Sequence, residues 1–234
     1  MSTVMITGGS RGIGAAAVEL FAARGDRVYF LYEKDHAAAE NVAKKTGATP
    51  ICCDVADGEA VEKVFAQIGA LDILVCNAGI YRGGLIHQLP SADWDRLFDV
   101  NVKGIYHCVK AAMPAFLQTH SGCIINISSM WGQVGASCEV PYSSAKAAVI
   151  GFTKSLAKEL APSGITVNCI CPGVIDTQMN HILDKEVLDQ LADETPLGRL
   201  GTPEDVCNCA EFLISEKASF ITGQILGVNG GYII

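Results

Sequence analysis

The 234-residue chain carries 17 Lys and Arg residues against 25 Asp and Glu residues, and half of its residues are hydrophobic. The resulting net charge of −8 argues against nucleic acid as a partner. No apolar run reaches the ~18 residues of a membrane-spanning helix, so we expect no membrane partner. The first apolar run begins at Thr3, which leaves no room for a signal peptide and indicates a cytoplasmic protein.

Ten cysteines and five histidines are scattered through the sequence without the spacing of a metal site. The cysteines form no CxxC pair, and most stand inside apolar runs such as Cys169-Ile170-Cys171. A disulfide framework is not expected in a chain of this size without an export signal. We therefore predict buried free thiols and no metal ion.

The chain opens with a predicted strand, Thr3–Thr7, then the loop Gly8-Gly9-Ser10-Arg11-Gly12-Ile13-Gly14 and a helix over 15–23. Strand, glycine turn and helix begin a βαβ unit. The glycines let the backbone approach a phosphate, and the helix N-terminus supplies N–H donors and positive potential. The spacing is TGxxxGxG rather than GxGxxG, and such a loop can also be a simple tight turn. Its position directly after an N-terminal strand favours a nucleotide cofactor.

The end of the second predicted strand, Arg27–Tyr32, should meet the adenosine ribose of a dinucleotide. NAD sites place an acidic residue here, and NADP sites favour a basic one. Tyr32 stands at that position, with Lys34 close by and Arg11 in the glycine loop. These residues favour NADP, while Glu33 leaves NAD open.

Two more strands are predicted over 49–53 and 71–76, after helices over 35–46 and 59–67. Asp54 follows the first of these strands. It can accept a hydrogen bond from the adenine amino group or cap the next helix, and the sequence leaves both open. Asn77-Ala78-Gly79 follows the second strand, where small residues let the backbone run close beneath a nucleotide.

A long helical pattern over 94–117 contains Asn101 and Gly104 in its middle. Both are poor residues for a helix interior, so we expect a local kink. The kink can serve an Asn101 carbonyl that holds a water molecule beside Lys146, or it can be a packing notch at Gly104.

Tyr142 and Lys146 stand four residues apart in a predicted helix over 142–160 and share one face, with side-chain roots about 5–6 Å apart. A neighbouring ammonium favours phenolate, so we expect a lowered tyrosine pKa and proton transfer near neutral pH. Ser129 ends a strand over 122–129, at the edge where parallel sheets bind ligands. The pattern YxxxK alone is also compatible with an ordinary amphipathic helix. The loop 130–140, with Trp131 and Glu139, should line the pocket.

The remainder of the chain supplies a strand over 165–170, a helix over 203–215 and a closing strand over 224–228. The polar segment 174–200 has no strong periodicity and is expected to be a mobile substrate loop. Strands and helices alternate without a linker or repeat. We predict a single domain over 1–234 of the α/β class, with six or seven strands in a three-layer, doubly wound parallel sheet.

Together these residues resemble the short-chain dehydrogenase/reductase family over nearly the whole chain. The resemblance is carried, in order, by Thr7-Gly8-x-x-x-Gly12-x-Gly14, Asn77-Ala78-Gly79, Asn101, Ser129, Tyr142-x-x-x-Lys146 and Pro172-Gly173. It implies a Rossmann fold and NADPH/NADP as cofactor, with NAD as the other option. It also implies a homotetramer or homodimer that packs through the helices after Trp94 and Tyr142.

The resemblance implies a reduction in which NADPH gives a hydride to a carbonyl carbon while Tyr142 protonates the oxygen. Ser129 would steady that oxygen, Lys146 would lower the tyrosine pKa and bind the nicotinamide ribose, and Asn101 would hold a water relay. The implied cofactor residues are Gly8, Ser10, Arg11, Gly12, Ile13, Gly14, Tyr32, Lys34, Asp54, Val55, Asn77, Ala78, Gly79, Tyr142, Lys146, Pro172, Gly173, Ile175 and Thr177. The implied substrate residues are Ser129, Trp131, Glu139 and Tyr142.

Within the family, the chain looks most similar to bacterial 3-oxoacyl-[acyl-carrier-protein] reductases. That similarity implies a carrier-bound 3-oxoacyl thioester as substrate and a step of fatty-acid synthesis. Members of that group often carry basic residues before the catalytic-serine strand and after the tyrosine helix. His120, Cys123 and Ser163 stand there instead, which weakens the argument for docking of an acidic carrier.

The loop 131–140 departs from that group and looks like the loop of reductases that act on the 5-aminopentanone-modified lysine of bacterial elongation factor P. Glu139 lies three residues before Tyr142 and can attract a primary ammonium on such a substrate. Alternatively, it caps the tyrosine helix or faces water. A third interpretation, a non-catalytic nucleotide sensor, is disfavoured by the complete set of four catalytic residues.

Overall fold

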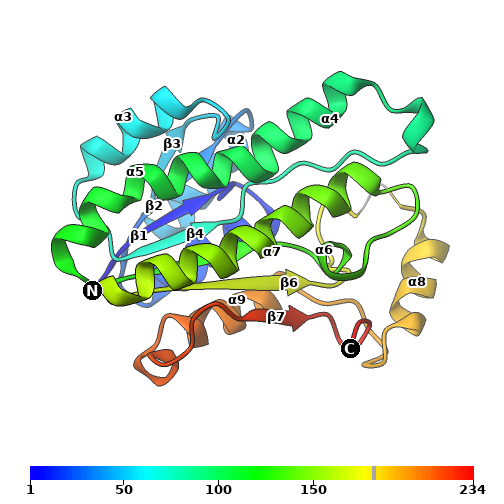
Figure 1. Ribbon diagram of the computed structural model, residues 1–234. Coiled ribbons are helices and arrows are strands. Elements are labelled where there is room, and N and C mark those ends of the chain that lie inside the picture. The colour runs from blue at the N-terminus through cyan, green and yellow to red at the C-terminus, as the bar shows by residue number, and fades with distance from the viewer. Residues whose placement is uncertain (181–182) are drawn as a thin grey trace.

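Seven parallel strands form one sheet in the computed structural model, which describes residues 1–180 and 183–234 (Figure 1). Across the sheet they run β3 (Thr49–Cys52), β2 (Arg27–Tyr32), β1 (Thr3–Thr7), β4 (Ile73–Cys76), β5 (Gly122–Ile127), β6 (Ile165–Pro172) and β7 (Ile225–Val228). The order reverses between β1 and β4, which pair in parallel from Val4 with Ile73 to Ile6 with Val75. This is the predicted doubly wound α/β fold, and its reversal point is where such sheets bind ligands.

Helices cover both faces of the sheet (Figure 1). One face carries α1 (Gly12–Ala23), α2 (His36–Thr46) and α9 (Pro203–Leu213), and the other carries α3 (Gly58–Ile68), α5 (Gly104–Thr119) and α7 (Val140–Leu160). Successive side chains of β1 alternate between the two cores: Val4 and Ile6 join the first, and Met5 joins the second. Because both faces of the central strands β1, β4, β5 and β6 are buried, these strands are nearly continuous apolar runs rather than alternating ones.

The helix predicted over 94–117 is broken in its middle. α4 (Ser91–Phe98) leads into a π-helical turn over Asp99–Lys103, and α5 follows. A Cβ atom on the buried Gly104 would lie 2.6 Å from Cγ2 of Val55. The kink is therefore present, and Gly104 is a packing notch at which a larger residue would displace Val55.

Two short helices fall in segments that we expected to be irregular. α6 (Trp131–Val134) packs against α7, and α8 (Lys185–Glu194) lies within the predicted substrate loop, of which residues 181–182 are outside the described part. The close approach of α6 to α7 depends on Gly132, where a Cβ would meet the Lys146 carbonyl carbon at 2.7 Å. No residue of α8 is fully buried, although the helix is amphipathic, with Val187, Leu188 and Leu191 on one face.

The ten cysteines are free thiols, and most of them are buried. Within the described residues, no helix is long and apolar enough to cross a membrane. The same residues contain no group of three metal-ligating side chains.

Candidate active site

The predicted catalytic and cofactor residues come together at the carboxyl ends of β4 and β5, beside the glycine loop after β1. A cavity of about 280 Å³ opens there. Its walls include Ser129, Tyr142 and Lys146 of the predicted catalytic set. They also include seven predicted cofactor residues, namely Ile13, Asn77, Gly79, Pro172, Gly173, Ile175 and Thr177.

Ser129 and Tyr142 line this cavity together, and the Ser129 side chain is close enough to influence the Tyr142 hydroxyl. The backbone N–H of Trp131 donates to Oγ of Ser129 at 3.2 Å and fixes the hydroxyl. Burial raises the pKa of Tyr142 above its usual value, and the Ser129 side chain only partly opposes this. The lowered tyrosine pKa that we predicted is therefore wrong for this structure, because burial has the largest effect and the ammonium of Lys146 does not lower this pKa. The phenol is protonated at neutral pH and can act as a proton donor.

Lys146 is almost completely buried, one turn along α7 from Tyr142. Its Nζ donates to the Ile127 carbonyl at 2.9 Å and lies 5.7 Å from the centre of the Tyr142 ring. Its own backbone carbonyl accepts a hydrogen bond from Oγ of Ser128 at 2.7 Å. Burial lowers the pKa of Lys146 to about 8. The ammonium is thus held in place by strand β5 and titrates close to neutral pH.

Asn101 is fully buried in the π-helical turn, and its side chain bonds the chain after β4. Oδ1 accepts from the Ile80 N–H at 2.8 Å, and Nδ2 donates to the Ile80 carbonyl at 2.9 Å. A Cβ on Gly79 would lie 3.4 Å from Oδ1 of Asn101 and 3.5 Å from Nζ of Lys146. The side chain of Asn101 therefore fixes the backbone beside Lys146, while the predicted water relay through its carbonyl stays a prediction.

The glycine loop forms a cradle that only glycine permits. Gly8 and Gly12 have positive φ angles of +68° and +54°, and a Cβ on Gly14 would lie 2.1 Å from the Gly8 carbonyl oxygen. Nδ2 of Asn77 donates to the carbonyls of Thr7 and Gly8 at 3.0 and 3.2 Å, which ties β4 to this loop. Bare backbone at the N-terminus of α1 fits the pyrophosphate of a dinucleotide.

The predicted adenosine end lies outside the walls of the cavity and is charged. The hydroxyl of Tyr32 is 3.0 Å from Nδ1 of His36. Oε1 of Glu33 accepts from Nζ of Lys34 at 2.9 Å and from the Arg96 guanidinium at 3.1 Å. The one acidic residue at the end of β2 is therefore already paired with two cations.

Asp54 at the end of β3 belongs to the same charged group. Its Oδ2 accepts from Arg96 at 2.9 Å, and its Oδ1 accepts from the Ala56 N–H at 2.9 Å. The helix cap that we considered for Asp54 is wrong, because the N-cap of α3 is Asp57. The next predicted cofactor residue, Val55, points into the core against Gly104.

Glu139 and Trp131 line the substrate side of the cavity. Glu139 stands at the N-cap position of α7, but its side chain makes no capping hydrogen bond, so that alternative is wrong. Oε1 accepts from the Tyr81 hydroxyl at 3.3 Å, while Oε2 is enclosed without a hydrogen-bond partner among the described residues. Burial raises the pKa of Glu139, with the Tyr81 hydrogen bond opposing it.

Several residues of the site were missed in the sequence. Tyr81 packs edge-on against Tyr142, with ring centres 5.4 Å apart. It follows Asn77-Ala78-Gly79 closely, and that proximity is a signal which could have revealed it. Arg96 carries no comparable signal, because it reaches Glu33 and Asp54 only through the fold. The missed cavity residues of the segment 174–200 are Val174, Met179, Asn180, Leu183 and Leu191.

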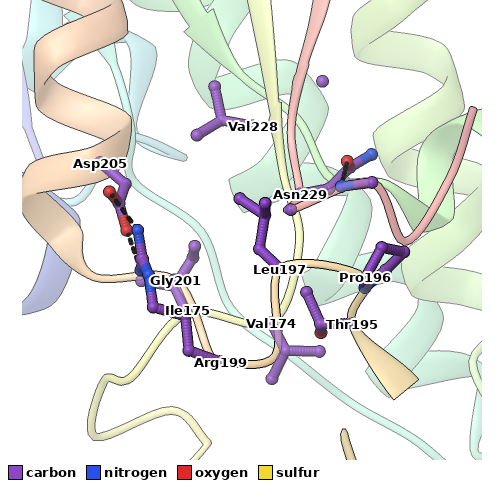
Figure 2. Close-up of a pocket in the computed structure, with 13 residues that line it drawn as sticks. Val174, Ile175, Thr195, Pro196, Leu197, Arg199, Gly201, Asp205, Val228 and Asn229 are labelled. Carbon is purple, nitrogen blue, oxygen red and sulfur yellow. Dashed lines mark hydrogen bonds and ion pairs between the residues drawn. The ribbon is translucent and has the colours of Figure 1, made fainter. Parts of the chain in front are cut away.

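A second, larger cavity of about 530 Å³ lies where the segment 174–200 returns to the sheet beside β7. Figure 2 shows its apolar walls, among them Leu197 and Val228, and the ion pair between Arg199 and Asp205 at one side. The Arg199–Asp205 contact is 2.6 Å. None of the four predicted catalytic residues lines this cavity, so its greater volume does not make it the reaction site.

A glycine cradle lies at the reversal point of a doubly wound sheet, next to a serine and a tyrosine that line one cavity and a buried lysine. This arrangement defines a dinucleotide-dependent oxidoreductase of the Rossmann type. A family model described as enoyl-(acyl carrier protein) reductase matches residues 8–233. The chain belongs to the short-chain dehydrogenase/reductase family.

Similar proteins span nearly the whole chain. The 3-oxoacyl-[acyl-carrier-protein] reductase FabG of Staphylococcus aureus (strain Mu50 / ATCC 700699) is 42% identical over 98% of this chain and 97% of that protein. The uncharacterised oxidoreductase YmfI of Bacillus subtilis (strain 168) is 40% identical over 98% of both chains. The FabG protein of Chlamydia muridarum (strain MoPn / Nigg) is 39% identical over 97% of this chain and 95% of that protein.

Proposed function

We propose that the protein is an NADPH-dependent reductase that delivers a hydride to the ketone of a 3-oxoacyl thioester. The observation that carries this proposal is that Ser129, Tyr142 and Lys146 line one cavity together with Ile13 of the glycine loop. The names of the S. aureus and C. muridarum relatives support the thioester.

Tyr142 and Ser129 act on the carbonyl oxygen. A protonated phenol can donate to that oxygen as charge develops on it, and a hydroxyl held by the Trp131 N–H can donate a second hydrogen bond. Proton donation of this kind accelerates a reaction by about 10²–10⁴-fold. Both groups sit on buried backbone, so they need no rearrangement before the reaction.

Lys146 and Asn101 support this pair. We assign the Lys146 ammonium to the nicotinamide ribose and to the proton supply of Tyr142, because it is buried beside both the tyrosine ring and Gly79. Asn101 keeps the backbone of Gly79 and Ile80 against the ammonium, and its carbonyl is assigned the water that returns a proton. NADPH, when bound, supplies the hydride.

The cofactor assignment rests on the glycine cradle and on the cations near the end of β2. The loop Gly8–Gly14 and the backbone of Asn77-Ala78-Gly79 are assigned the pyrophosphate and nicotinamide side. Arg11 and Lys34 are assigned the 2′-phosphate of NADPH. Glu33 is neutralised by its two cations, so its charge opposes the phosphate only weakly.

Three further assignments complete the proposal. The chain acts as a single domain over 1–234 with a substrate loop over 174–200. It forms a homotetramer or homodimer through the helices after Trp94 and Tyr142. It works in the cytoplasm, where free cysteines such as those of this chain persist.

The decisive experiment follows NADPH oxidation by the purified protein with an acetoacetyl thioester on coenzyme A and on acyl-carrier protein. A crotonyl thioester tests reduction of a carbon–carbon double bond instead, and NADH tests the cofactor. NADPH oxidation with the acetoacetyl substrates supports the proposal. NADPH binding without oxidation of any substrate would overturn it in favour of a nucleotide sensor.

A second candidate function is favoured by the enclosed Oε2 of Glu139, which has no partner among the described residues although it borders the cavity beside Tyr142. A primary ammonium on the substrate would supply both the charge and the hydrogen-bond donor for this oxygen. The function is then reduction of the 5-aminopentanone-modified lysine of elongation factor P.

Glu139→Gln separates the two functions. The change should weaken turnover of modified elongation factor P about tenfold and leave an acetoacetyl thioester unaffected, since only the amine needs the negative charge. Because burial raises the pKa of Glu139, the KM for the amine substrate should also rise as the pH falls through that pKa and the carboxylate is protonated. Equal effects on both substrates, or none, would remove the second candidate.

A further inference from the structure

The two sides of the substrate cavity are held in different ways. Trp131 on α6 is anchored through its N–H to Ser129, next to the reacting centre. The opposite side is formed by the segment 174–200, including Leu191 of α8. No residue of α8 is fully buried, so packing in the core does not fix this helix. Another contact has to set its distance from the Trp131 side.

The C-terminal tail supplies that contact. Figure 1 shows the chain end beyond β7 next to the lower end of α8. The hydroxyl of Tyr232 donates to Oε2 of Glu194, the last residue of α8, at 2.7 Å. The ring of the same residue meets Trp131 edge-on, with ring centres 5.9 Å apart. Tyr232 therefore touches both sides of the cavity from outside.

The tail is rigid enough to transmit this contact. Asn229 accepts from the Gly231 N–H with its side chain at 3.0 Å and from the Tyr232 N–H with its carbonyl at 3.1 Å. The Gly230 carbonyl accepts from the Leu197 N–H at 3.1 Å, directly after α8. Figure 2 shows Asn229 facing Pro196 and Leu197 across the larger cavity. The C-terminal tail, residues 229–232, and the chain at Leu197 are thus joined by hydrogen bonds.

We propose that Tyr232 is a positioning residue that holds α8 against the Trp131 side and so sets the affinity for the substrate. The proposal rests on the proposed function only in placing the substrate in this cavity. The hydrogen bond from the Tyr232 phenol to the Glu194 carboxylate is charge-assisted and therefore stronger than a bond between neutral groups. Its strength agrees with the lowered pKa of Glu194, of which the Tyr232 bond is the first cause.

Tyr232→Phe tests the bond alone, because phenylalanine keeps the ring on Trp131. We expect the KM for the substrate to rise about five- to tenfold with kcat nearly unchanged. Amide hydrogen exchange of Lys185–Glu194, measured in the protein without substrate, should become faster. Glu194→Ala should reproduce both effects, the double variant should add little, and Glu194→Gln should restore much of the affinity because its amide oxygen still accepts.

Tyr29→Phe is the matched control, because it removes a tyrosine hydroxyl on β2, five strands away from β7 and the tail. Wild-type exchange in α8 of the Tyr232→Phe protein would overturn the proposal, as would an unchanged KM. If the wild-type protein reduces none of the offered substrates, the proposed function fails, whereas the exchange measurement still decides the role of Tyr232.

Discussion

The two ends of the predicted dinucleotide site differ in how deeply their charged side chains are buried. At the catalytic end, Lys146 is 4% exposed and bonds a backbone carbonyl. At the adenosine end, the Lys34 side chain is 82% exposed and pairs with Glu33 on the surface. Buried groups have few alternative partners, whereas exposed charges can exchange theirs at little cost. The chemistry should therefore be hard to change by substitution, and the choice of cofactor easy.

The largest effect should follow Tyr142→Phe. This change removes the proton donor but keeps the ring packed against Tyr81, so we expect kcat to fall by about 10²–10⁴-fold. NADPH affinity, measured by fluorescence titration, should stay within a factor of about two. Undiminished turnover would mean that Tyr142 is not the proton donor.

Gly14→Ala should abolish NADPH binding without touching any side chain of the catalytic end. The new Cβ would lie 2.1 Å from the Gly8 carbonyl oxygen, which the backbone can relieve only by opening the cradle. Calorimetric titration with NADPH measures the loss, and circular dichroism verifies that the variant is folded. Wild-type affinity in a folded variant would contradict the assignment of this loop.

A smaller effect should come from pH at the buried end. Because the pKa of Lys146 is lowered to about 8, the ammonium is present below that pH and is lost as the pH rises through it. NADPH affinity should then weaken about fivefold between pH 7 and 9, if the charge is worth about 1 kcal/mol. The Tyr142→Phe protein is the sample of choice, since its phenol no longer titrates. An affinity that is flat over this range would contradict the role of Lys146.

The smallest effect is expected at the exposed end. Glu33→Gln removes the acid that pairs with Lys34 and Arg96, which frees Lys34 for a 2′-phosphate and leaves Arg96 paired with Asp54 alone. Exposed charges contribute up to ~1 kcal/mol, so the preference for NADPH over NADH should rise by about fivefold. Glu62→Gln on α3, whose carboxylate pairs with Lys110, is the control with the same change in net charge. Equal shifts in both variants would show that Glu33 has no special place in cofactor choice.

The sequence predicted the fold well because each strand is a short, continuous apolar run bounded by glycine or polar residues. β1 and β2 match the predicted ranges, and the sheet has seven parallel strands where six or seven were predicted. The misses have local causes. α8 is a short helix of ten residues inside a mostly polar segment. The kink near Asn101 was expected, but its π-helical form over Asp99–Lys103 depends on contacts of Asn101 with Ile80 that no periodicity reveals.

The sequence identified the residues Ser129, Tyr142 and Lys146 of the site, but it did not predict the direction of the Tyr142 pKa shift. Spacing brought Tyr142 and Lys146 to one helix face, as the structure has them. Spacing carries no information about burial, however, and burial reverses the expected direction of the Tyr142 pKa. The partners of Glu33 and Tyr232 come from distant segments, Arg96 and Glu194, so only the folded chain shows them.

The difference in exposure among the free cysteines allows two of them to be labelled selectively. Cys52 and Cys138 are the exposed cysteines; Cys52 donates to the Glu33 carbonyl at 3.4 Å, and Cys138 directly precedes Glu139. Burial raises the pKa of thiols such as Cys76 and Cys207 to about 12, which keeps them unreactive toward alkylating dyes. A mild maleimide treatment should therefore label Cys52, near the predicted adenosine end, and Cys138, beside Glu139. The emission of a dye at Cys52 would report binding of the cofactor, and that of a dye at Cys138 would report binding of the substrate.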